Sequence, residues 1–133
     1  MYGYTPHTVL PFTVEFQPGS PAYEQVLYAV HKAILQGQLS PGEKFPSVRA
    51  LSVELQINPS TAHKVVAALT AEGLLEVQPG VGTVLSNRAR ILPEDRTTLL
   101  KSGLERLVVD ARRLGLTKEQ VVSALLQHWK NLS

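Results

Sequence analysis

The chain has 133 residues, of which 44% are hydrophobic and 18% charged, with no cysteine and a formal net charge of +2. That length can bury a core unaided, and the lack of cysteine excludes disulfides, a thiolate nucleophile and zinc sites that use sulfur. No apolar run approaches the roughly 18 residues of a membrane span, and the N-terminus has no signal-peptide pattern, so we expect a cytoplasmic protein without a membrane partner.

The first 20 residues are expected to form an N-terminal arm. Phe12, Val14 and Phe16 alternate with polar residues until "QPGSP" stops the pattern, which predicts a short strand. An arm laid on the main fold for stability is the simpler interpretation, and a functional arm stays open.

Three helices and a hairpin are predicted next. Apolar spacing indicates a helix from Pro21 to Gly37, and Ser47 offers a cap for a second, short helix. A tight connection at residues 56–58 leads to a third helix that ends near Gly73. Beyond it, "LLEV" and "TVLS" flank "QPGVG", which predicts a small β-hairpin.

The third helix carries the pattern that bears most on function. Asn58 is a suitable cap and Pro59 fits the first helical position. At 100° per residue its apolar side chains share one face, which holds Ala62, Val65, Val66 and Leu69, and the opposite face holds Ser60, His63, Lys64 and Ala67. Small and cationic side chains near a helix N-terminus suit entry into a DNA major groove. An ordinary solvated face is the alternative.

The C-terminal third is predicted to be purely helical. Leucines and one alanine recur at spacings of four, three, four and three residues, as in a heptad seam. Thr117 and Gln120 have capping-box spacing for a last helix. Two helices of this length need a cover for their apolar stripes, so we expect a homodimer. The predicted interface residues are Leu100, Leu104, Leu107, Ala111, Leu114, Leu125 and Trp129.

Several motifs, taken in order, resemble the GntR-type bacterial transcription regulators, in particular the short YtrA-like subfamily. They are "PAYEQV", "QGQLSPGEKFPSVRALSVEL", "INPSTAHKVVAAL", "AEGLLEVQPGVGTVLS" and "ARRLGLTKEQVVSALLQHW", and they run from about Phe16 to the C-terminus. The resemblance implies a mainly α fold with a small β-hairpin: an arm (1–20), a winged helix-turn-helix DNA-binding domain (21–87) and a C-terminal helical dimerisation region (88–133). It also implies a dimeric repressor on a two-fold symmetric double-stranded DNA operator.

The resemblance further implies which residues meet DNA. The recognition helix, residues 59–72, would enter the major groove, and the wing, residues 78–83, would approach the minor groove. The candidate DNA-binding residues are Ser47, Arg49, Asn58, Ser60, Thr61, His63, Lys64, Gly80, Gly82 and Thr83. Many relatives have basic residues where this chain has Gln78 and Val81, so weak contacts between wing and phosphate are expected.

Two other classes of function compete with this interpretation. An enzyme is not expected, because the four histidines, His7, His31, His63 and His128, lie far apart and show no metal-ligand spacing; no cofactor or metal is implied. A winged helix that serves only as a protein-interaction module is the alternative, since residues 21–86 carry four basic and five acidic residues. A small-molecule effector at the dimer cleft stays open.

Overall fold

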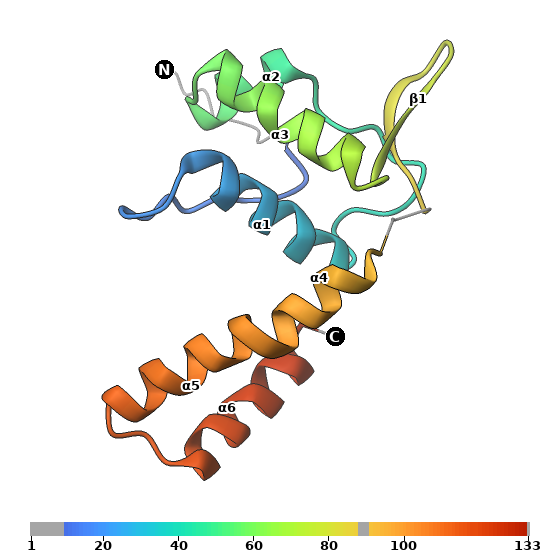
Figure 1. The fold of residues 1–133 in the computed structure, drawn as a ribbon. Coiled ribbons are helices and arrows are strands. Elements are labelled where there is room, and N and C mark those ends of the chain that lie inside the picture. Colours follow the sequence, from blue (N-terminus) through green and yellow to red (C-terminus); the bar gives the residue numbers. More distant parts are fainter. Residues whose placement is uncertain (1–9, 88–90, 133) are drawn as a thin grey trace. The chain divides into compact units, whose positions relative to one another are not determined.

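The computed structural model describes residues 10–87 and 91–132 and divides the chain into two compact units, Met1–Arg90 and Ile91–Ser133 (Figure 1). The predicted domain boundary between residues 87 and 88 borders on residues 88–90, which lie outside the described residues, as does the start of the arm. No helix in the described ranges combines the length and apolar character needed to cross a bilayer.

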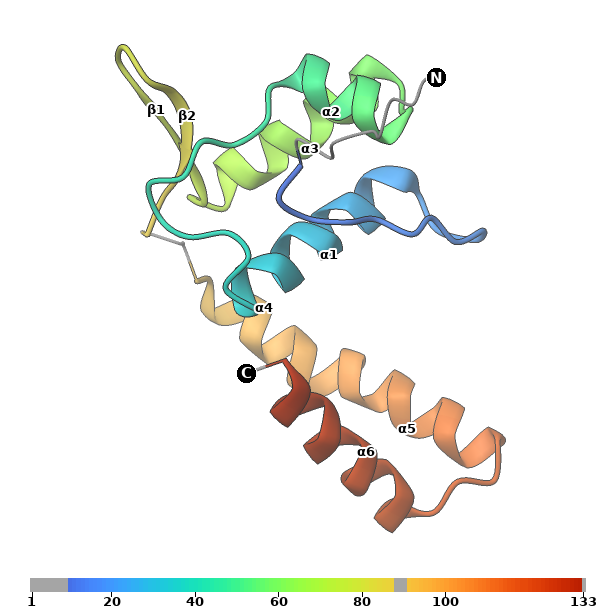
Figure 2. The same cartoon turned by 180° about the vertical axis from the view of Figure 1, so that it is seen from behind.

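The first unit has the predicted order of three helices and a hairpin. The helices are α1 (Ala22–Leu35), α2 (Val48–Leu55) and α3 (Pro59–Ala71). Strands β1 (Leu75–Gln78) and β2 (Gly82–Leu85) pair antiparallel, with Leu75 opposite Leu85 and Gln78 opposite Gly82. Figure 2 shows the hairpin projecting beyond the helices of this unit. The mainly helical fold with one small hairpin is therefore confirmed.

The helices of this unit enclose one apolar core. Fully buried side chains come from each helix, and the leucines of the hairpin base close the core. Its central members are Val26, Val30, Leu51, Ala62, Val65, Leu69, Leu75 and Leu85. The three-helix arrangement buries the apolar face of every helix, as the spacing of these residues predicts.

The predicted strand in the arm is wrong: residues 10–20 contain no strand. Phe12 is buried and its ring stacks on Phe45 with centroids 6.1 Å apart, whereas Phe16 is exposed. The Gln17 backbone forms hydrogen bonds with a side chain and not with a neighbouring strand. Its N–H donates to Gln25 Oε1 at 2.7 Å, and its carbonyl accepts from Gln25 Nε2 at 2.9 Å. The alternation thus coincides with a buried ring at Phe12, but the backbone of this segment pairs with no strand.

A tight turn joins α2 to α3. Gln56 has φ 53° and ψ 46°, a left-handed conformation that is unfavourable for a residue with a side chain. Ser52 Oγ donates to the carbonyl oxygen of Ile57 at 2.7 Å, which ties the turn back to α2. At the other end of α2, Ser47 Oγ accepts from the backbone N–H of Ala50 at 3.1 Å, so the predicted cap is confirmed.

The second unit contains four helical segments: α4 (Pro93–Thr98), a π-helical turn η1 (Leu99–Gly103), α5 (Leu104–Arg113) and α6 (Lys118–Asn131). The capping box of Thr117 and Gln120 is present at the start of α6. The π turn was not predicted. It places the Leu104 N–H on the Leu99 carbonyl, five residues back, and so interrupts the α-helical phase of the heptad seam between Leu100 and Leu104.

Candidate nucleic-acid interface

The exposed face of α3 begins at its capped N-terminus. Asn58 Oδ1 accepts from the backbone N–H of Ser60 at 2.9 Å, and Pro59 occupies the first turn. The opposite face is anchored by fully buried side chains, Ala62, Val65 and Leu69. Ser60, His63, Lys64 and Ala67 are exposed, as predicted, and Thr61 lies half-buried between the two faces.

The helix cap uses some of the hydrogen-bonding groups that were predicted to contact DNA. Ser60 Oγ also donates to Asn58 Oδ1, at 2.9 Å, so its hydroxyl hydrogen is directed at the cap. The lone pairs of Ser60 Oγ and the side-chain N–H groups of Asn58 are not used by these bonds. Ser60 can therefore accept, and Asn58 can donate, without breaking the helix start.

Lys64 has a partner that the sequence did not reveal. Its ammonium nitrogen lies 4.0 Å from the centroid of the Tyr23 ring, close enough for a cation–π contact between α3 and α1. Residues 41 positions apart in sequence give no local signal for such a contact. The Tyr23 ring thus holds the Lys64 ammonium at the side of the recognition helix.

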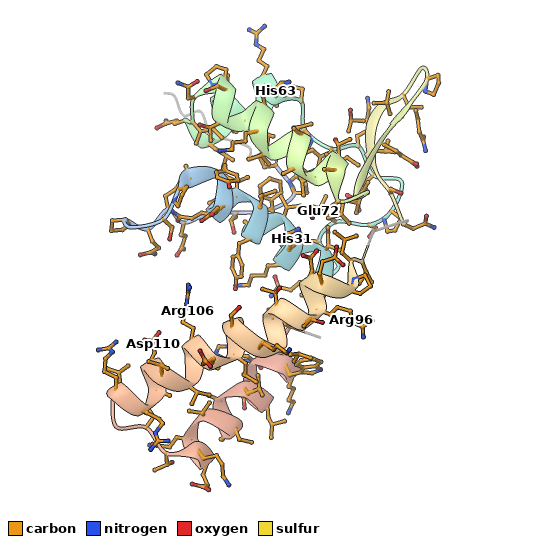
Figure 3. The ribbon with its side chains drawn as sticks, viewed as in Figure 1. His31, His63, Glu72, Arg96, Arg106 and Asp110 are labelled. Atoms are coloured by element: carbon orange, nitrogen blue, oxygen red, sulfur yellow. The ribbon has the colours of Figure 1, made fainter. Side chains whose placement is uncertain are left out.

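A second unpredicted contact joins the C-terminal end of α3 to α1. His31 Nε2 lies 2.7 Å from Glu72 Oε1, and both side chains are partly exposed (Figure 3). Glu72 is the C-cap residue of α3. Together with the Lys64 contact near the middle of α3, this pair joins α3 to α1 at two points.

Arg49 is the second residue of α2, behind the cap formed by Ser47, and its side chain is exposed. A guanidinium in this position can grip a phosphate or a guanine edge with two hydrogen bonds. Ser47, also a candidate contact, already accepts a hydrogen bond with its hydroxyl oxygen at the helix start.

The wing tip depends on glycine geometry. Gly80 has φ 79° and Gly82 has φ 114°, conformations that favour glycine, and the Val81 N–H closes the turn on the Gln78 carbonyl at 3.0 Å. Thr83 is half-buried, and its carbonyl accepts from the Phe45 N–H at 2.9 Å. The turn explains both glycines, and their contact with DNA stays a prediction.

The predicted dimer residues lie in the second unit and are mostly exposed. Leu107, Ala111, Leu114 and Leu125 line a groove of about 400 Å³ between α5 and α6. Ala111 is buried, whereas Leu100 is 69% and Trp129 75% exposed. The structure therefore brings four of the seven together within one unit.

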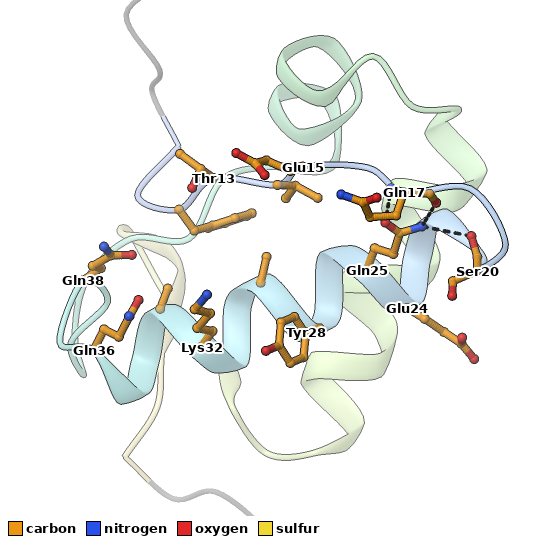
Figure 4. Close-up of a pocket in the computed structure, with 14 residues that line it drawn as sticks. Thr13, Glu15, Gln17, Ser20, Glu24, Gln25, Tyr28, Lys32, Gln36 and Gln38 are labelled. Carbon is orange, nitrogen blue, oxygen red and sulfur yellow. Dashed lines mark hydrogen bonds between the residues drawn. The ribbon is translucent and has the colours of Figure 1, made fainter. Parts of the chain in front are cut away.

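A second concavity lies between the arm and α1 (Figure 4). Its volume is about 640 Å³, and its lining mixes amides, carboxylates and a cation. Gln25 spans one end through bonds to the backbone carbonyls of Gln17 and Ser20. Glu15, Tyr28 and Lys32 also line it. No pattern in the sequence indicates this groove, because it depends on where the arm crosses α1.

A short helix, a tight turn, a second helix with an exposed N-terminal face and a glycine-rich hairpin define a winged helix-turn-helix DNA-binding protein. The family described as bacterial regulatory proteins, gntR family, matches residues 22–85. The chain is 34% identical over 109 residues to the HTH-type transcriptional repressor YtrA of Bacillus subtilis, covering 81% of this chain and 84% of YtrA.

Two further similarities agree with this match. The uncharacterized HTH-type transcriptional regulator YhcF of Bacillus subtilis is 31% identical over 111 residues, which cover 84% of this chain and 92% of YhcF. A solved structure of a GntR family transcriptional regulator from Listeria monocytogenes is 26% identical, with a TM-score of 0.61 and coverage of 84% of this chain and 98% of that chain. The chain belongs to the GntR family and is a DNA-binding transcription regulator of the short, YtrA-like kind.

Proposed function

We propose that the protein is a repressor that binds a two-fold symmetric operator as a homodimer, with α3 in the major groove and the wing near the minor groove. The observation that carries the proposal is the division of α3 into a fully buried apolar face and an exposed face of small and cationic residues at a capped N-terminus. The repressor role extends to this chain what the name of YtrA states for that protein.

The homodimer is supported by the apolar surface of the second unit. Most leucines and valines along α5 and α6 are 44–63% exposed, and these include Leu104, Leu107, Val108, Val109, Leu114, Val122, Leu125 and Leu126. A helical pair with so much uncovered apolar surface needs a partner, and a second copy would cover it symmetrically.

Selection of bound fragments from the genome of the source organism tests the function directly. A single palindromic sequence recovered by the protein, with affinity that falls steeply as salt rises, is the expected result. A winged helix that serves only as a protein-interaction module would recover no sequence, and this outcome would remove the operator-binding proposal.

A small-molecule effector has two places to bind in this proposal: the dimer cleft and the groove between the arm and α1. The groove volume of about 640 Å³ falls within the usual range of ligand sites. A ligand screen monitored by thermal stability and operator affinity tests both places. A Lys32→Ala variant separates them, because only binding in the groove should depend on Lys32.

A further inference from the structure

The wing has no cation of its own. Among residues 75–85 the single charged side chain is Glu76. Lysine and arginine contacts with phosphate supply much of the affinity of any DNA-binding element. A wing that approaches the DNA backbone with this composition therefore needs its positive charge from another part of the fold.

The segment before α2 runs along the free edge of β2. Gly42 N–H donates to the Leu85 carbonyl at 2.7 Å, Leu85 N–H donates to the Glu43 carbonyl at 2.9 Å, and Phe45 N–H donates to the Thr83 carbonyl at 2.9 Å. This ladder sets Lys44 opposite Val84. The loop that precedes the helix-turn-helix thus extends the wing by one strand-like edge.

The pairing fixes the face on which Lys44 lies. Residues opposite each other in a sheet share a face, so Lys44, Val84 and its other partner Glu76 stand in one row, and Gly82 lies on the same face two residues along. Val84 is fully buried but lies outside the main core cluster. An aliphatic lysine stem laid across Val84 fits this burial.

The side chain of Lys44 runs toward the wing tip. Its Cε lies 4.0 Å from the position that a Cβ on Gly82 would take. In the described part of the chain, no carboxylate lies within ion-pair distance of its ammonium. The fold therefore places the unpaired positive charge of Lys44 beside the tip of a hairpin that has no positive charge of its own.

We propose that Lys44 is the phosphate-binding residue of the wing, holding the DNA backbone beside the minor groove while α3 lies in the major groove. This inference rests on the proposed function. An ammonium acts here as a point charge, so the contact adds affinity without sequence preference.

The test compares wild type, Lys44→Gln and Lys44→Arg on the selected operator and on an unrelated duplex of equal length, over a series of salt concentrations. Glutamine keeps most of the stem over Val84 and removes the charge. For a dimer, Lys44→Gln should flatten the slope of log affinity against log salt by about 1.8 on both duplexes, roughly 0.9 for each phosphate that Lys44 neutralises. Lys44→Arg should keep the slope.

Lys118→Gln is the matched control, because it removes one exposed lysine of the second unit that the proposal does not place on DNA; its slope should equal that of wild type. A second variant, Val81→Lys in the Lys44→Gln background, returns a charge to the exposed wing tip and should restore most of the slope. Thermal unfolding checks that each variant is folded.

An unchanged slope in folded Lys44→Gln would overturn the inference. Failure of Val81→Lys to restore the slope would place the effect of Lys44 away from the wing and would also overturn it. Absence of salt-dependent binding in the wild type is a different result, which would refute the proposed function itself.

Discussion

At the scale of single residues, the contact of Lys64 with Tyr23 would prepare this lysine for the DNA contact that we propose. A free lysine loses rotamer entropy when it binds a phosphate. Here the ammonium already rests over the Tyr23 ring, 4.0 Å from its centroid. The side chain is thus partly ordered on the flank of α3, and in the proposed complex Tyr23 would act as a positioning residue.

Arg49→Ala and Lys64→Ala should each weaken operator binding by about 1–3 kcal/mol, because in the proposed complex each side chain makes a strong polar contact with DNA. Operator affinity measured by fluorescence anisotropy checks this, with Lys32→Ala as control. Unchanged affinity in both variants, with the fold intact, would remove these residues from the interface.

The contact between Tyr23 and Lys64 should be measurable as a coupling free energy of unfolding. A double-mutant cycle with Tyr23→Leu and Lys64→Met is expected to give about 0.5–1 kcal/mol, the usual strength of an exposed cation–π pair. Denaturant unfolding of the four proteins supplies the values. Tyr23→Phe keeps the ring and should retain most of the coupling, and additive losses would show that the two residues do not interact.

At the scale of elements, local patterns predicted most of the fold, whereas contacts between elements escaped prediction. The caps at Ser47 and Asn58 follow from residue type and position alone, so the starts of α2 and α3 could be located from the sequence. The two faces of α3 follow from its period of 3.6 residues. The position of Lys44 beside β2 could not be predicted in this way. It depends on the pairing of Lys44 with Val84, which are distant in sequence and meet only in the folded chain.

Two errors have the same origin. Alternation of Phe12, Val14 and Phe16 resembles a strand, yet strand formation also needs backbone pairing with another strand, and these residues have none. The heptad spacing near Leu100 assumed an unbroken α-helix, and the π turn at residues 99–103 interrupts it. Both outcomes depend on backbone partners that a pattern of side chains does not specify.

The turn between α2 and α3 offers a test of backbone strain. Gln56→Gly should leave the free energy of unfolding unchanged or raise it by up to about 1 kcal/mol, because glycine adopts φ 53° without steric cost. Gln56→Val should lower it, since a β-branched residue is least suited to this conformation. Chemical denaturation compares the three proteins, and a gain for valine would contradict the explanation.

At the scale of the whole molecule, the two units differ in how much of their apolar surface is exposed to solvent. The first unit encloses most of its buried apolar side chains in one core. In the second unit Ala111 is the one buried residue among those described, and most of its large apolar side chains are exposed. Such a surface is what a subunit interface requires, and a two-fold pair of recognition helices matches a palindromic operator.

Replacing Leu104 and Leu107 together by glutamate should therefore give monomers, because two charges would enter the apolar contact. Monomers hold one half-site, so operator affinity should fall about a hundredfold or more. Analytical ultracentrifugation measures the change. Leu35→Glu, at a position 65% exposed in the first unit, is the control and should stay dimeric; dimers persisting in the double variant would move the interface elsewhere.

Two buried side chains of the arm have a consequence for where an autonomous folding unit begins. The family match starts at residue 22, yet Leu10 and Phe12 belong to the core of the first unit, and Phe12 covers the ring of Phe45 next to Lys44. Losing a buried phenylalanine typically costs about 3–5 kcal/mol, a large share of the 5–15 kcal/mol that holds most domains together. A fragment cut at the family boundary would thus lose part of its own interior, along with the support beneath the strand-like edge of the wing.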